Sequence, residues 1–150
     1  MKITTELLMS WKPCRSYTRE IVSSLLGDGK TPLEICDGDI PGQDCEWVLL
    51  RPEIIPEPEL HELACKFAEH ALLDERKSGR EPDLRSWAAI EAKRKWLRKQ
   101  ITDEQLAAVR AAAWAAAWAA VGAAVRAAAR AAEIKWQLAE INKVLIRIER

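Results

Sequence analysis

The feature that most constrains the fold of this chain is an alanine-rich stretch, residues 107–132, in which 17 of 26 residues are alanine. Its only aromatic side chains are Trp114 and Trp118. Alanine has the highest helix propensity, up to about 0.7 kcal/mol per position better than other ordinary residues, because its side chain loses no rotamer freedom in a helix. The stretch therefore predicts a long helix around which the other segments pack.

This helix is expected to be water-exposed rather than membrane-spanning. Between Arg110 and Arg126 only 15 consecutive residues are uncharged, whereas a span needs roughly 20 strongly apolar residues. The N-terminal sequence MKITTELLMSW lacks the long apolar core and small-residue cleavage site of a signal peptide. A cytoplasmic location is therefore expected.

Length and charge predict a folded single domain with an internal charge split. The 150 residues contain 23 basic and 23 acidic side chains. Residues 1–73 hold 7 basic and 13 acidic side chains, whereas residues 74–150 hold 16 and 10. The two halves could attract each other, or they could offer an acidic face and a basic face to partners.

Local signals divide this domain into three segments. Residues 1–56 predict short helices and loops, with a cap at Thr4 or Thr5 and a capping box at Thr31 and Glu34. Within this segment, residues 44–51 favour a helix because no second strand-like run exists to pair with them. Residues 57–100 predict a helical pair, 58–73 and 83–99, and the second helix is expected to turn Leu84, Trp87, Ala88 and Leu97 inward. Residues 102–150 predict a long Ala/Trp-rich helix or a broken one, beginning at a Thr102–Gln105 capping box.

Two apolar stripes of different phase follow in this last segment. A 4-3 series from Ala107 and Ala111 through Trp114 to Ala132 lies about 160° from a second series, Ile134 to Ile148, on a continuous helix. Either the helix breaks near Gly122 or between Ala132 and Ile134, or one helix about 70 Å long exceeds the roughly 40 Å width of a 150-residue globule. An unbroken helix would protrude and favour a partner or a homodimer. The predicted fold is an all-α helical bundle, with short N-terminal helices packed on long C-terminal ones.

Two groups of residues are candidates for binding a partner. Trp114 and Trp118 share one helix face, either as core filler or as an exposed protein-binding anchor. The densest positive cluster is Lys93, Arg94, Lys95, Arg98 and Lys99. On a helix this cluster spreads over more than half the circumference, so it forms either a solvated face or a docking surface. An acidic protein ranks above a nucleic acid as its partner, because the chain has no net positive charge.

The cysteines and histidines allow a weaker, metal-based alternative. His61 and Cys65 are spaced i and i+4 on a predicted helix, and Cys36 and Cys45 could complete a structural zinc site. Their spacing matches no known zinc module, so buried reduced thiols and no cofactor are the main prediction. A disulfide would require an oxidising compartment.

No motif for catalysis is present. The segment DGDIPGQD lacks the ligand spacing of a calcium loop, and GDGK is not a phosphate-binding P-loop. No sequence pattern marks a Cys/His pair as a nucleophile and base. The sequence therefore predicts a protein that is not an enzyme.

Three segments, MKITTELL, WVLLRPEIIPEPELHELACKFAEH and RSWAAIEAKRKWLRKQITDEQLAAVRAAAWAAAWAA, carry a resemblance. Together they resemble a loose group of uncharacterised bacterial and phage proteins with Ala/Trp-rich helical C-terminal repeats, some of them labelled as immunity proteins. The resemblance covers most of the chain and transfers no catalytic residues. It implies an accessory protein of a phage or mobile element that neutralises a toxin or a host defence protein such as a CRISPR effector.

The functional hypothesis is therefore a non-enzymatic inhibitor or immunity-type protein that occupies a surface of a larger protein. Its acidic N-terminal half would mimic nucleic-acid charge, or its Lys93–Lys99 helix would dock on an acidic surface. The alternatives are a zinc-stabilised structural module and a self-associating helical scaffold.

Overall fold

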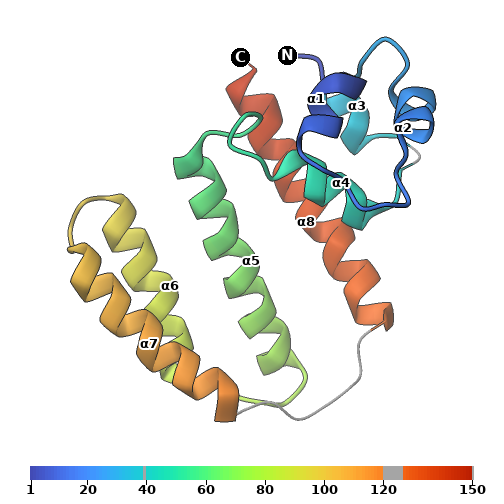
Figure 1. Cartoon of the computed structure of the whole chain (residues 1–150). Coiled ribbons are helices and arrows are strands. Elements are labelled where there is room, and N and C mark those ends of the chain that lie inside the picture. The colour runs from blue at the N-terminus through green and yellow to red at the C-terminus, as the bar shows by residue number, and fades with distance from the viewer. Residues whose placement is uncertain (39, 120–126, 150) are drawn as a thin grey trace. The chain divides into compact units, whose positions relative to one another are not determined.

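The protein is all-α, as the sequence predicts. The computed structural model describes residues 1–38, 40–119 and 127–149, which contain eight helices and no β-strand (Figure 1). In chain order these are α1 (Thr5–Ser10), α2 (Arg19–Leu26), α3 (Pro32–Cys36), α4 (Gly42–Leu49), α5 (Glu57–Lys77), α6 (Leu84–Leu97), α7 (Asp103–Ala119) and α8 (Ala127–Ile148). None of these helices combines the length and apolar character that crossing a membrane requires.

The helices form two compact units. The first unit comprises Met1–Pro56 and Ala127–Arg150, and the second comprises Glu57–Arg126. The segment 102–150 is thus divided between them, with α7 in the second unit and α8 in the first. The predicted break between Ala132 and Ile134 is wrong, because α8 continues through both residues. The other predicted break, at Gly122, lies outside the described residues.

Side-chain caps begin α1, α2 and α3 of the first unit. Thr4 accepts a hydrogen bond from the backbone of Leu7 at 3.3 Å, and Thr18 caps α2 in the same way. The capping box of α3 is confirmed: the Glu34 amide donates to the Thr31 hydroxyl at 3.2 Å, and the Thr31 amide donates to the Glu34 carboxylate at 2.7 Å. Local polar chemistry therefore sets where these helices begin.

A pair of backbone hydrogen bonds ties the N-terminus to the α2–α3 loop. The Ile3 amide donates to the Lys30 carbonyl at 2.7 Å, and the Lys30 amide donates back at 3.1 Å. Gly29, just before this pair, has φ +96°, and a Cβ there would lie 3.3 Å from the Ile3 carbonyl oxygen. Glycine is favoured at this position because it adopts positive φ and allows the close backbone approach.

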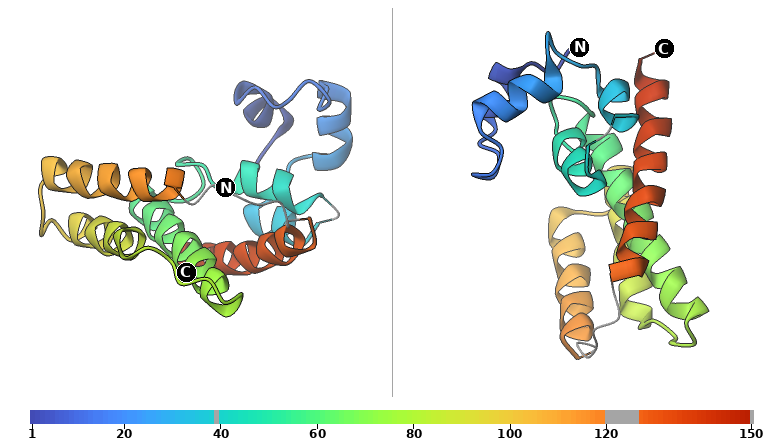
Figure 2. Two further views of the ribbon diagram at one scale, coloured as in Figure 1. Left: turned by 90° about the horizontal axis from the view of Figure 1, so that it is seen from below. Right: turned by 90° about the vertical axis from the view of Figure 1, so that its right-hand side faces the viewer.

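Helix α8 supplies much of the core of the first unit. It packs against α3 and α4, and both views in Figure 2 show it running beside them. The predicted C-terminal stripe is largely confirmed, since Ile141 and Leu145 are fully buried and only Ile148, at 37% exposed, lies open. The fully buried side chains of this unit include Ile3, Val22, Ile35, Cys45, Leu49 and Ile55. The stripe thus covers short helices that have too little apolar surface of their own.

Gly42 lies where α4 packs closely on α8. A Cβ at this position would lie 2.5 Å from Ile134 Cγ2 and 3.2 Å from Leu138 Cδ1. We expect Gly42→Ala to lower the free energy of unfolding by about 1–3 kcal/mol, as other overpacked cores do. Chemical denaturation measures the loss.

The matched test of this contact is the Ile134→Ala background. In that background the added methyl group has room, so Gly42→Ala should lower the free energy of unfolding much less than it does in the wild type. An equal cost in both backgrounds would contradict the close packing of α4 on α8.

The second unit places α6 between two neighbours. Helix α6 packs on both α5 and α7, and Figure 2 shows α6 and α7 running side by side. The predicted inward face of α6 is wrong in part: Leu84 is 79% exposed and Ala88 is exposed, whereas Ile90 and Ala92 are buried. A helix with neighbours on two sides buries more than one narrow stripe, so single-stripe periodicity misplaces its inner face.

Helix α7 begins as the sequence predicts. The Thr102 amide donates to the Gln105 side chain at 2.9 Å, and the Gln105 amide donates back to the Thr102 hydroxyl at 3.3 Å. Among residues 103–113 Leu106 is buried, whereas Ala107 and Ala111 of the predicted series are exposed. Because larger side chains bury more area, this part of α7 packs through Leu106 and not through the predicted series of alanines. Trp114 and Trp118 belong to α7, but their side chains lie outside the described part.

Candidate functional site

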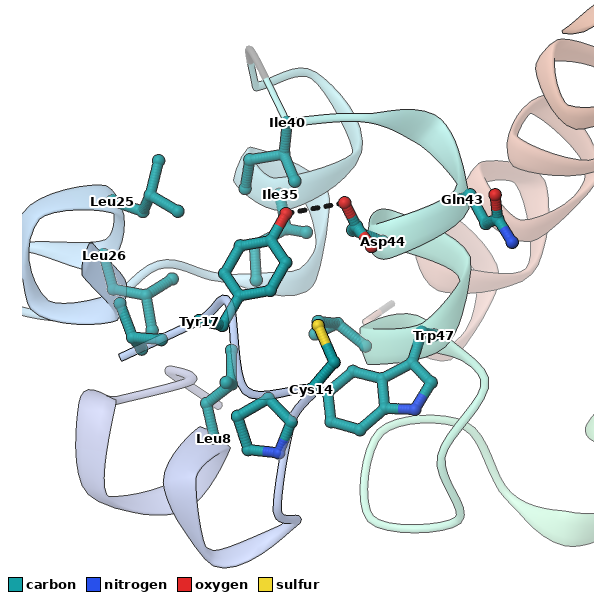
Figure 3. A pocket seen from close by; sticks show the side chains of 13 residues that line it. Leu8, Cys14, Tyr17, Leu25, Leu26, Ile35, Ile40, Gln43, Asp44 and Trp47 are labelled. Atoms are coloured by element: carbon teal, nitrogen blue, oxygen red, sulfur yellow. Dashed lines mark hydrogen bonds between the residues drawn. The ribbon is translucent and has the colours of Figure 1, made fainter. Parts of the chain in front are cut away.

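A small apolar pocket opens in the first unit among α1, α2, α3 and α4 (Figure 3). Its volume is about 180 Å³. Most of its wall is aliphatic, and the polar groups come from the α1–α2 loop and from α4. The lining residues are Leu8, Pro13, Cys14, Tyr17, Val22, Leu25, Leu26, Ile35, Ile40, Gln43, Asp44, Trp47 and Val48.

One hydrogen bond joins the two sides of the pocket. The Tyr17 hydroxyl donates to the Asp44 carboxylate at 2.6 Å, as the dashed line in Figure 3 marks. This bond, together with burial and the negative charge of Asp44, raises the pKa of Tyr17 to about 12. The phenol therefore stays protonated at neutral pH and acts as a hydrogen-bond donor, not as a base.

Tyr17 is the only tyrosine of the chain, which makes its ionisation directly measurable. We expect the phenolate absorbance to titrate with a pKa of about 12, and Asp44→Asn to move the pKa down toward 10.0. Because the folded pKa is raised, the stabilisation is complete below pH 10 and is lost as the pH rises through 12. A wild-type titration at the ordinary value, unchanged in Asp44→Asn, would contradict the hydrogen bond.

A stack of two tryptophans and an arginine lies beside the pocket. The Arg51 guanidinium carbon lies 4.1 Å from the ring centroid of Trp47 and 5.1 Å from that of Trp11. Arg51 Nε also donates to the Trp47 carbonyl at 3.3 Å. Trp47 lines the pocket and is 39% exposed. We call the pocket together with Trp11, Trp47 and Arg51 the anchor surface.

Arg51 differs from Arg76, which also stacks on a tryptophan. In the second unit, Arg76 lies over Trp87 but also binds the Glu81 carboxylate at 2.6 Å. Among the residues that the structure describes, no carboxylate forms an ion pair with Arg51. Its charge is held in place by the two aromatic rings.

The predicted basic cluster is only partly available for a ligand. Arg94 turns toward α5, where it binds Glu62 at 3.2 Å and Glu69 at 2.8 Å. The Lys93 ammonium lies 3.7 Å from the Trp96 ring centroid. Lys95 pairs with Glu91 at 2.9 Å, Arg98 donates to Gln100 at 3.3 Å, and Lys99 has φ +57°. The five residues therefore do not form one continuous basic face.

Lys93 borders a wider groove of the second unit. This groove, about 670 Å³, lies between α5, α6 and α7 and is lined mainly by small side chains. Lys93 and Arg110 both reach it. Burial, and then the neighbouring positive charge of Arg110, lower the pKa of Lys93.

The Arg94 ion pairs are expected to stabilise the contact between α5 and α6. The hydrogen bond from Arg94 lowers the pKa of Glu69 below its ordinary value of 4.5. Its stabilisation is therefore complete above pH 4.5 and is lost as the pH falls through the lowered folded value. We expect Arg94→Gln to lower the free energy of unfolding by about 1 kcal/mol at neutral pH, allowing for partial exposure.

Chemical denaturation at neutral and acid pH measures this difference, which should shrink below pH 4.5. Lys95→Gln is the control, because Lys95 pairs with Glu91 of its own helix. An equal loss of stability in the two variants, independent of pH, would contradict a specific role for Arg94.

The four residues of the zinc alternative divide between the units. Cys36 and Cys45 belong to the first unit, and His61 and Cys65 belong to the second. Cys45 Sγ donates to the carbonyls of Ile35 and Ile40, each at 3.5 Å. Burial raises the pKa of Cys36 to about 11, and it also raises the pKa values of Cys45 and Cys65. Zinc binds thiolates, whereas these surroundings favour the protonated thiols.

Sequence reasoning missed the anchor surface. Trp47 and Arg51 are four residues apart, a spacing that places side chains together on a helix. This local signal could have been found, but the approach of Trp11 and Tyr17 depends on tertiary structure. No protein-family model, curated protein or solved structure matches the chain. The resemblance to bacterial and phage proteins therefore stays a prediction.

Proposed function

We propose that this protein binds another protein through the anchor surface. The observation that carries the proposal is a partly exposed Trp–Arg–Trp stack beside an apolar pocket. Tryptophan, tyrosine and arginine are the residue types most enriched among energetically dominant interface residues. Trp11, Tyr17, Trp47 and Arg51 bring all three types together in one unit.

The size and chemistry of the pocket support a binding role over catalysis. Its volume of about 180 Å³ is below the roughly 300–1,000 Å³ of sites that enclose drug-sized ligands. The hydrogen bond to Asp44 keeps Tyr17 protonated and raises the pKa of Tyr17 to about 12. General bases work best with a pKa near the working pH. A pocket of this kind is suited to receive a single side chain.

An inhibitor or immunity-type role is the proposed biological form of this binding. The protein would occupy a surface of a toxin or of a host defence protein such as a CRISPR effector, as the resemblance implies. Net charge gives little support to nucleic-acid mimicry, because the first unit contains 11 basic and 12 acidic residues and the second contains 12 and 11. The proposal therefore places recognition on the anchor surface, not on one charged half of the chain.

Selection from a library of random displayed peptides tests this proposal. The full-length protein should enrich peptides whose affinity falls about tenfold or more in Trp47→Ala and Arg51→Ala, the effect expected of dominant interface residues. Arg76→Ala is the matched control, since Arg76 also stacks on a tryptophan but is paired with Glu81. Circular dichroism checks that each variant is folded.

Two outcomes would refute protein binding through the anchor surface. One is a failure to enrich any peptide. The other is enrichment of peptides that bind the Trp47 and Arg51 variants as tightly as the wild type.

A further inference from the structure

The pocket of the anchor surface has room for one ring or one branched aliphatic group. An apolar protein cavity of about 150 Å³ is large enough to bind benzene, and this pocket measures about 180 Å³. It opens beside Trp47, which belongs to both the pocket wall and the Arg51 stack. An apolar side chain that enters the pocket therefore brings its own neighbours in sequence close to Trp47.

Arg51 is arranged to bind an anion at this place. Its guanidinium is held by two indole rings, and Nε is occupied by the Trp47 carbonyl. A guanidinium has five N–H donors in a fixed planar arrangement that matches a carboxylate. The remaining donors have no carboxylate partner in residues 1–38, 40–119 and 127–149. Because the rings already restrict the side chain, binding an anion would cost little additional rotamer entropy.

An arginine of the second unit shows how a carboxylate binds a guanidinium that is stacked on tryptophan. Arg76 stacks on Trp87 in a similar way, with its guanidinium carbon 5.1 Å from the ring centroid. Its Nε donates to Glu81 Oε2 at 3.0 Å, and its Nη2 donates to Glu81 Oε1 at 2.6 Å. One stacked arginine is therefore paired with a glutamate of the same chain. Among the described residues Arg51 has no such carboxylate, which leaves its guanidinium available to a partner.

We propose that the anchor surface recognises a protein segment in which an aromatic or branched aliphatic residue is flanked by an acidic residue. The apolar side chain enters the pocket, and the Asp or Glu carboxylate binds Arg51. This inference rests on the proposed protein-binding function and names the chemistry of its partner. Charge complementarity to Arg51 selects an acidic flank over a neutral or basic one.

Matched short peptides provide the probe. Acetyl-Glu-Phe-Glu-amide carries an acidic residue on each side of the anchor, so its register does not matter, and acetyl-Gln-Phe-Gln-amide is its neutral counterpart. In an NMR titration of the full-length protein, we expect the acidic peptide to shift the indole signals of Trp11 and Trp47 and the amide signal of Tyr17. Affinities of ligands this small are roughly millimolar.

The ratio of the two affinities measures the contribution of Arg51. We expect the acidic peptide to bind about fivefold to tenfold more tightly than the neutral one, as for a charge-assisted hydrogen bond at an accessible site. Arg51→Gln should bring the ratio close to one. Arg76→Gln should leave it unchanged, because the Arg76 guanidinium is already occupied by Glu81.

A second pair of measurements tests the pocket. Acetyl-Glu-Ala-Glu-amide keeps both charges but lacks the anchor, so it should bind about tenfold or more weakly, in line with the loss of a buried phenyl group. Leu25→Phe places extra volume in the pocket wall and should weaken the phenylalanine peptide without removing Arg51. Melting temperature identifies any variant that has lost its fold.

Two results would overturn the inference. One is equal affinity of the acidic and neutral peptides for the wild type. If displayed peptides still depend on Trp47 in that case, protein binding stands and only the acidic flank is refuted. The other is a homodimer in analytical ultracentrifugation that Arg51→Gln dissociates, since a second copy would then supply the partner.

Discussion

The first unit depends on the packing of α8 against α3 and α4. Helices α1 to α4 have only five to eight residues each, and isolated helices shorter than about 12–15 residues are marginal in water. For α3 and α4, Ile141, Val144 and Leu145 of α8 provide a longer apolar surface. The close contact at Gly42 shows how tightly α4 is held on that surface. A segment distant in sequence thus supports two of the short N-terminal helices.

Because α8 holds one face of α4, the opposite face is free to build the anchor surface. Cys45 and Leu49 turn into the core, whereas Asp44 and Trp47 line the pocket. Arg51 lies just beyond the end of α4, and its guanidinium lies over the Trp47 ring. The short helix and the residues that follow it therefore connect the core to the binding groups. Their rigid support lowers the entropy that ordering these groups would otherwise cost on binding.

Features set by neighbouring residues could be predicted from the sequence, and features set by tertiary contacts could not. The Thr31 and Thr102 capping boxes and the stripe from Ile134 to Leu145 are short-range or strictly periodic. Leu84 was expected inside α6 because it is apolar, but it begins the helix and is 79% exposed. The anchor surface was missed because Trp11 and Arg51 meet only when α1 and α4 fold together.

The cations of this protein show why local charge density is a poor guide to a binding site. The Lys93–Lys99 cluster is the densest in the sequence, yet Arg94 is bound by two carboxylates and Lys95 by one. Such pairs satisfy the charge within the chain, so a ligand would have to displace them. Arg51 stands apart from other cations in the sequence, but two aromatic rings orient it beside an apolar pocket. An oriented charge with no counterion among the described residues is a stronger sign of recognition than a cluster of paired charges.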